Sequence, residues 1–114
     1  MNFEISHSNQ YSTVTSNVDK LDATKASELK SEFVLLNKKG INSIVLNLGK
    51  TKYCDSSGLS AILVANRLCK DSSGKFVLCG LNATIMKLVS IAQLDRIFTI
   101  VDTLEEAQAF MKEK

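Results

Sequence analysis

The chain has 114 residues, 45% of them apolar and 23% charged, with a formal net charge of +2. This length suits a single domain over residues 1–114 with an ordinary globular core. The basic residues are spread along the chain, so we expect no direct nucleic-acid partner. No apolar run approaches the roughly 20 residues that cross a bilayer, and no signal-peptide pattern opens the chain. We therefore expect no membrane insertion and a cytoplasmic location.

Cysteine and histidine usage argues against a metal site or a bound cofactor. Cys54, Cys69 and Cys79 are odd in number and lack the spacing of metal ligands, and His7 is the single histidine. We expect buried thiols in a reducing compartment; the alternative is a reactive role for Cys54, which lies beside the suspected site.

Residue periodicity in the first half of the chain predicts two strands, a helix and a strand. The strands cover residues 3–7 and 11–18, with a hairpin turn between them. A helix opens at Asp22 and closes at Gly40, with apolar residues three and four apart. Residues 41–48 are almost continuously apolar, as expected of a strand covered on both faces.

The second half alternates helix and strand. Residues 59–70 predict a helix, 75–79 a strand, and 96–101 the last strand. Asn82 is placed to cap the helix between these strands. Thr103 and Glu106 have the spacing of a capping box for the final helix. The order ββαβαβαβα predicts an α/β fold with a mixed, mostly parallel sheet of about five strands and about four helices.

The tetrapeptide Asp-Ser-Ser-Gly occurs twice, in different settings. The copy at residues 55–58 follows a strand and leads into a helix, where backbone N–H groups and the helix dipole favour negative charge. The copy at 71–74 follows the same helix and predicts a polar turn, with Gly74 supplying the backbone conformation. Only the first copy is interpreted as a site.

The helix over residues 59–70 is apolar almost all the way round. Such a helix is either buried on most sides or has an apolar strip reserved for a partner. We expect an exposed strip beside Ser56, and hence a protein-binding surface. The alternative is that the last helix covers it.

Two motifs resemble those of the STAS domain, the anti-sigma-factor antagonist family. One is Leu46-Asn47-Leu48 followed by Tyr53-Cys54-Asp55-Ser56-Ser57-Gly58-Leu59. The other is Leu21-Asp22-Ala23-Thr24-Lys25-Ala26 followed by Leu29. The order of strands and helices resembles the family over essentially the whole chain.

The resemblance implies a phosphorylation-switched protein rather than an enzyme. In that family an anti-sigma factor that is also an ATP-dependent serine kinase phosphorylates the serine after the aspartate, here Ser56, and a serine phosphatase reverses the step. The unmodified form binds the anti-sigma factor and releases a sigma factor, so transcription rises. Asp22 contributes to recognition and phosphotransfer. The implied partner-binding residues are Asp22, Asp55, Ser56, Ser57, Gly58, Leu59 and Ile62.

Several departures from the family leave the partner's identity open. Asp19 and Lys20 replace a frequent Gly-Glu pair, Thr51 replaces an apolar residue, and Lys50 and Lys52 make the approach to the site basic.

Two other interpretations stay open. Ser56 has a simpler role as a helix N-cap. The domain also fits a regulatory subunit of a membrane transporter that has no serine cycle. An enzyme is disfavoured, because Ser56 lacks a nucleophile elbow and a histidine partner.

Overall fold

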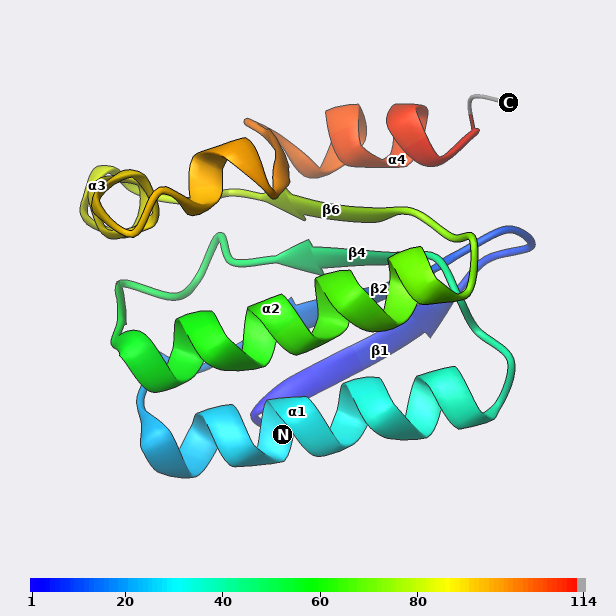
Figure 1. Cartoon of the computed structure of the whole chain (residues 1–114), viewed down its shortest axis with the longest axis horizontal. Coiled ribbons are helices and arrows are strands. Elements are labelled where there is room, and N and C mark those ends of the chain that lie inside the picture. Colours follow the sequence, from blue (N-terminus) through cyan, green and yellow to red (C-terminus); the bar gives the residue numbers. More distant parts are fainter. Residues whose placement is uncertain (113–114) are drawn as a thin grey trace.

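The computed structural model describes residues 1–112 (Figure 1). Its elements, in chain order, are β1 Phe3–His7, β2 Ser12–Ser16, β3 Lys20–Leu21, α1 Ala23–Lys38, β4 Ile44–Asn47, β5 Tyr53–Cys54, α2 Ser56–Asp71, β6 Phe76–Cys79, α3 Ala83–Ile91, a 3-10 helix Leu94–Arg96, β7 Thr99–Val101 and α4 Leu104–Lys112.

Five strands form one mixed sheet in the order β1-β2-β4-β6-β7. β1 lies at an edge and pairs antiparallel with β2, whereas each later neighbouring pair is parallel. This arrangement confirms the predicted α/β class, the opening hairpin and the mostly parallel sheet. Because the parallel strands share a direction, their carboxyl ends meet at one rim of the sheet.

Helices cover both faces of the sheet. α1 and α2 lie side by side on one face, and α4 lies on the other (Figure 1). Alternate residues of β4 serve the two layers: Ile44 and Leu46 join the core under α1 and α2, and Val45 joins the smaller core under α4. The buried face of α1 consists of the predicted apolar residues Ala26, Leu29, Phe33 and Leu36.

Several element boundaries differ from the prediction. β4 begins at Ile44 because the end of α1 holds Ile41, whose N–H donates to the Leu36 carbonyl at 3.0 Å. The last strand is only three residues long, since the N–H groups of Ile97 and Phe98 both donate to the Leu94 carbonyl and keep these residues in the preceding turn. At α4, Thr103 caps the Glu106 N–H as expected, but the Glu106 carboxylate accepts from the Thr103 hydroxyl.

The second Asp-Ser-Ser-Gly copy is a turn, as predicted, but its glycine has a different role. Ser73, with φ 62°, adopts the left-handed conformation. At Gly74 an added Cβ would collide with the backbone carbonyl of Asn42. This glycine is therefore needed for close approach of two backbones rather than for its conformational freedom.

The neighbour of α2 also differs from one expectation. α1 packs along α2, whereas α4 lies on the opposite face of the sheet. The alternative in which the last helix covers α2 is therefore wrong. Part of α2 stays accessible, because Leu63, Val64 and Leu68 are half-buried.

Candidate functional site

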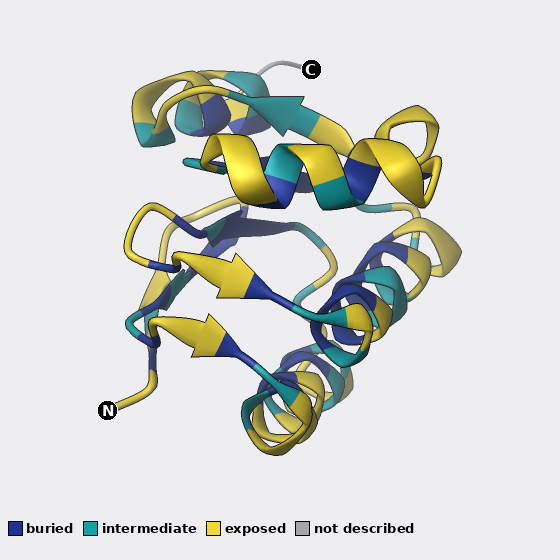
Figure 2. Cartoon of the chain, turned by 90° about the vertical axis from the view of Figure 1, so that its left-hand side faces the viewer, coloured by how far each residue is buried: buried dark blue, intermediate teal, exposed yellow. Residues whose placement is uncertain are grey.

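The starts of α1 and α2 are brought together by a small second sheet that sequence analysis missed. β3 and β5 pair in parallel, with Lys20 opposite Tyr53 and Leu21 opposite Cys54. Each strand has only two residues, exposed then buried, and runs directly into a helix. Figure 2 shows the two short arrows side by side, each leading into a helix seen end-on. Asp22 and Asp55 follow the paired residues and therefore occupy neighbouring positions.

Both aspartates are helix N-caps. Asp22 accepts a hydrogen bond from the Lys25 N–H at 3.2 Å. Asp55 accepts from the N–H groups of Ser57 and Gly58 at 2.9 and 3.1 Å. These bonds satisfy N–H groups that a helix start leaves without an intrahelical partner. The interpretation of Ser56 as the N-cap is therefore wrong, because Asp55 holds that position.

Ser56 is the first residue of α2, and its side chain is exposed. Within residues 1–112 its hydroxyl forms no hydrogen bond, whereas the N–H groups of the next two residues, Ser57 and Gly58, donate to the Asp55 carboxylate. Ser57 is half-buried. The hydroxyl of Ser56 thus faces solvent at the positive end of the α2 dipole, where added negative charge is favoured.

Gly58 fixes the distance between α2 and the small sheet. A Cβ at this position would lie 2.4 Å from the Cys54 sulfur and 2.8 Å from the Leu21 carbonyl oxygen. Any larger side chain would push the start of α2 away from β3 and β5. The glycine of the motif is therefore a packing requirement that joins the two halves of the site.

The predicted partner-binding residues separate into two groups. Asp22, Asp55, Ser56 and Ser57 lie at the surface or are half-buried. Gly58 and Leu59 are buried, and Ile62 is only 1% exposed and belongs to the core. Direct partner contact by Ile62 is thus corrected to a packing role, because its side chain supports the start of α2 from below.

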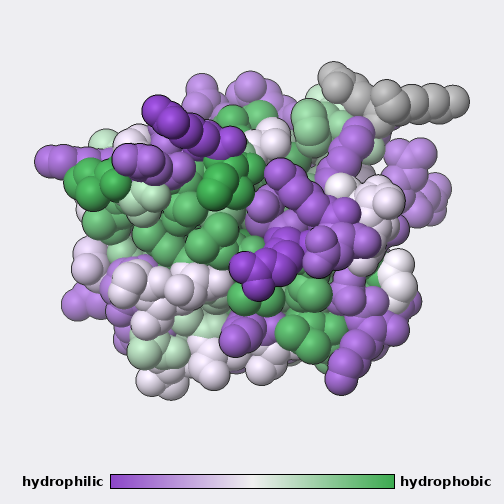
Figure 3. Space-filling model, viewed as in Figure 1, coloured by the Kyte–Doolittle hydropathy of each residue, from purple (hydrophilic) through white to green (hydrophobic). Residues whose placement is uncertain are grey.

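The exposed apolar surface lies further along α2 and on α3. Figure 3 shows apolar side chains gathered over α3 and the adjoining part of α2. On these two helices Leu63 and Leu88 are half-buried, and Ile91 is 69% exposed. Leu63 lies two helical turns from Ser56, about 10 Å along the axis. We call Leu63, Leu88 and Ile91 the α2–α3 apolar surface.

The segments in and around β3 and β5 carry several basic residues, namely Lys20, Lys25, Lys50 and Lys52. The backbone N–H of Lys52 donates to the Asp19 carbonyl at 2.8 Å, and Lys50 Nζ lies 3.4 Å from Asn17 Oδ1. Lys25 Nζ is 3.8 Å from Asp22 Oδ2. Lys25 is thus placed beside one of the two acidic caps.

Cys54 has the environment of an inert thiol. It is fully buried, and burial, together with the nearby Asp55 carboxylate, raises its pKa to about 12. Thiolate is the reactive form of cysteine, so this thiol is protected at neutral pH. Cys69 and Cys79 are also buried and free, as predicted.

The remaining chemistry-bearing residues lie apart from Ser56. His7 Nδ1 is 2.7 Å from the Ser12 hydroxyl, at the start of β2, whereas Ser56 lies beyond the carboxyl ends of the parallel strands. Within residues 1–112, no three acidic, histidine or cysteine side chains gather as metal ligands. None of the helices in this part of the chain is long and apolar enough to cross a membrane.

Comparison with known proteins identifies the class to which this fold and site belong. A family model of the STAS domain matches residues 6–107. The chain therefore belongs to the STAS domain family. Homologues carry the name anti-sigma factor antagonist. One of them, BtrV of Bordetella bronchiseptica, a candidate antagonist, is 28% identical over 92 residues, which cover 81% of this chain and 79% of that protein.

Solved structures agree with this assignment. The crystal structure of a candidate anti-sigma factor antagonist from Thermotoga maritima has a TM-score of 0.86 and 28% identity, covering 97% of this chain and 95% of that one. The unphosphorylated anti-sigma factor antagonist SpoIIAA has a TM-score of 0.76 at 17% identity, with 94% of both chains covered. The second likeness concerns the fold alone.

Proposed function

We propose that this chain is an anti-sigma factor antagonist whose partner binding is switched off by phosphorylation of Ser56. The partner is an anti-sigma factor that is also an ATP-dependent serine kinase, and a serine phosphatase restores the unmodified form. The observation that carries the proposal is the position of Ser56: an exposed hydroxyl, free of intramolecular bonds within residues 1–112, at the start of α2.

The surroundings of Ser56 support a binding surface as well as a modification site. The α2–α3 apolar surface includes Leu63 of the same helix and gives a partner an apolar area to cover. Asp22 and Asp55 present two carboxylates beside the hydroxyl, so a partner that reaches Ser56 also meets both caps. We propose Asp22, Asp55, Ser56, Ser57 and the α2–α3 apolar surface as the contact region.

Phosphorylation would change binding without unfolding the chain. The kinase transfers the γ-phosphoryl group of ATP to the Ser56 oxygen, which loses its proton, and ADP leaves. The product carries about −1.5 to −2 charges at neutral pH. The helix start tolerates this charge, but a partner surface that fits a neutral hydroxyl must desolvate it. A penalty of about 3 kcal/mol lowers affinity roughly a hundredfold.

The acceptor is identified by incubating the chain with its cognate anti-sigma kinase and ATP, followed by mass spectrometry. We expect one phosphate, on Ser56. Ser57 is the neighbouring serine of the same tetrapeptide. Ser72 and Ser73 are the comparison in the second copy, which has the same four residues in a turn. Phosphate on Ser72 or Ser73 alone would refute the site.

Two substitutions test the switch itself. Ser56→Ala keeps the Asp55 cap, so we expect normal folding, normal partner affinity and a permanently active output. Ser56→Asp places negative charge at the first helical position, where the dipole favours it, and should stay folded while binding weakly. Isothermal titration against the anti-sigma factor measures both. Equal affinities would contradict an electrostatic switch.

The same experiments separate this proposal from a transporter subunit. A regulatory subunit without a serine cycle would take up no phosphate, and both substitutions would leave its partner affinity unchanged.

A further inference from the structure

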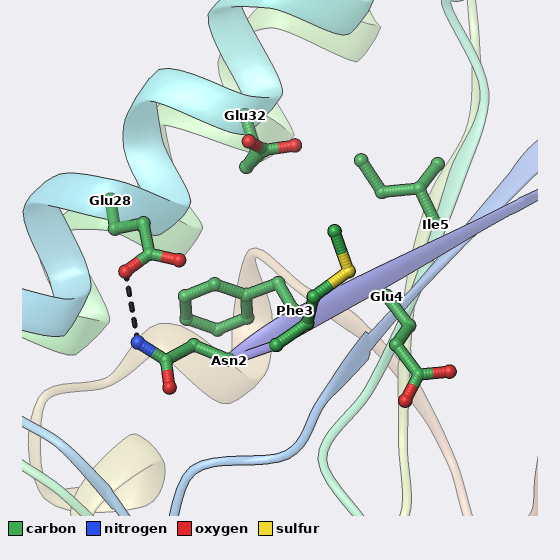
Figure 4. A pocket seen from close by; sticks show the side chains of 7 residues that line it. Asn2, Phe3, Glu4, Ile5, Glu28 and Glu32 are labelled. Atoms are coloured by element: carbon green, nitrogen blue, oxygen red, sulfur yellow. Dashed lines mark hydrogen bonds between the residues drawn. The ribbon is translucent and has the colours of Figure 1, made fainter.

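The outer edge of β1 and the neighbouring face of α1 enclose a hollow that lies outside the contact region proposed above. Its volume is about 600 Å³, and residues 1–5 line it together with Glu28 and Glu32. Figure 4 shows both glutamates on α1, with Phe3 and Ile5 on the side of β1 that faces the helix. Phe3 is buried and Ile5 half-buried, so the floor is apolar.

β1 offers a free row of backbone hydrogen-bonding groups along this hollow. Among residues 1–112 it pairs with β2 on one side and with no strand on the other. The backbone N–H of Asn17 donates to the Asn2 carbonyl, and the backbone N–H of Ser8 donates to the Tyr11 carbonyl. In an antiparallel pair hydrogen-bonded positions alternate, so the backbone groups of Phe3, Ile5 and His7 point outward. Such an edge accepts an additional strand.

The charge of the hollow is opposite to that of the chain as a whole. Glu28 and Glu32 of α1 contribute two carboxylates, and none of the seven lining side chains is basic. The side-chain amide of Asn17 donates to the Glu4 carboxylate at 2.7 Å, and that of Asn2 donates to the Glu28 carboxylate at 2.9 Å. Glu32 is half-buried and, within residues 1–112, forms neither a hydrogen bond nor an ion pair. The hollow thus combines an apolar floor with acidic walls.

We propose that the β1 edge binds an extended segment of a partner protein that carries lysine or arginine at alternate positions. The segment adds to the sheet through the outward backbone groups of β1. Alternate residues of a strand are about 6.7 Å apart, and Glu28 and Glu32 are separated by about 6 Å along α1, so two basic side chains match two carboxylates. Their alkyl stems cover Phe3 and Ile5.

A second copy of this chain does not fit the same edge. Pairing of two β1 strands would bring Glu4, Glu28 and Glu32 of both copies together without a basic side chain in either lining. Like charges opposite each other destabilise strand pairing. The edge is therefore protected against self-association while remaining open to a basic strand.

The first test uses a fluorescent peptide of alternating lysine and valine with the complete chain, and fluorescence anisotropy as the readout. We expect saturable binding with a dissociation constant below about 1 mM, weakened roughly tenfold by Glu28→Gln/Glu32→Gln and by high salt. The matched control, Asp95→Asn/Glu105→Gln, removes the same charge from exposed positions elsewhere and should bind like the parent. Absence of binding, or equal loss in both double variants, would overturn the proposal.

The second test separates strand addition from simple charge attraction. One version of the peptide is N-methylated on every lysine, the other on every valine, so each blocks one edge of the added strand. We expect one version to lose binding and the other to keep it. Retention or loss by both versions refutes strand addition, and so does a β1-mediated dimer in sedimentation. Phosphorylation of Ser56 stays normal in Glu28→Gln/Glu32→Gln, so this proposal and the proposed function fail independently.

Discussion

A buried pair of hydroxyl groups holds the loop that leads to the site, and its energetic contribution is measurable. Ser16 at the end of β2 and Thr51 between β4 and β5 are 0% and 2% exposed, and their side-chain oxygens are 2.7 Å apart. After Thr51 the chain bonds to the Asp19 carbonyl and then forms β5. The departure of Thr51 from the family's apolar residue is thus matched by a polar partner on β2.

We predict that removing one hydroxyl costs more than removing both. Thr51→Val preserves the shape of the side chain but leaves the Ser16 hydroxyl buried without its partner, which costs about 1–3 kcal/mol. Ser16→Ala likewise leaves the Thr51 hydroxyl buried without its hydrogen-bond partner. In Ser16→Ala/Thr51→Val both polar groups are gone, so we expect stability within about 1 kcal/mol of the parent.

Urea unfolding followed by circular dichroism measures all four proteins of this double-mutant cycle. The expected interaction free energy between the two hydroxyls is on the order of 1–2 kcal/mol. In thermal melts, each single variant should unfold several degrees below the parent. If the double variant lost the sum of the two single losses, the hydroxyls would be energetically independent and the reasoning would be refuted.

Three further predictions concern the site. Asp22→Asn should keep near-normal stability in urea, since asparagine caps as well as aspartate, while losing much of its phosphorylation or partner affinity; unchanged phosphorylation and binding would show that the charge is dispensable. Gly58→Ala should lower the free energy of unfolding by about 1–3 kcal/mol, because the added Cβ would lie 2.4 Å from the Cys54 sulfur. Gly49→Ala is the control, since its Cβ would have its nearest contact at 3.2 Å, and thermal melts should show a smaller loss of stability for it than for Gly58→Ala. Burial raises the pKa of the Cys54 thiol from 9.0 to about 12, so the unfolded chain releases this proton at a lower pH than the folded chain. The free energy of unfolding should therefore fall as the pH rises from about 9 toward 12, by up to about 1.4 kcal/mol per pH unit. Cys54→Ala should show a shallower fall in urea midpoints, and identical pH dependence in the variant and the parent would contradict the assignment.

The main elements were predictable because each repeats a local pattern several times. Ala26, Leu29, Phe33 and Leu36 recur at helical spacing, and all four are buried. β3 and β5 were not predictable in this way, since two residues cannot display a period. Their pairing depends on distant backbone groups such as the Asp19 carbonyl. The 3-10 turn Leu94–Arg96 was missed, and the last strand was predicted to begin too early, because Ile97 and Phe98 after the turn are apolar and also suit a strand.

The site was predictable in outline and uncertain in detail. The resemblance implied that Asp22 and Asp55 belong to one partner-binding region, and the register of Leu21 with Cys54 brings them to neighbouring positions. The buried side of α2 could not be identified, because apolar residues occupy nearly the whole helix surface. The packing of α2 against α1 and the sheet decides that Ile62 is buried while Leu63 stays accessible.

The shared starting point of α1 and α2 has an electrostatic consequence. The two helices run side by side in the same direction, so the positive ends of their dipoles are neighbours and repel each other. Asp22 and Asp55 place two negative charges at this junction and offset the repulsion. Two residues far apart in the chain therefore supply the negative charge at one junction of two helix starts. A phosphate on Ser56 would be a third anion at this junction, so its local stabilisation depends on the charge that the two caps already provide.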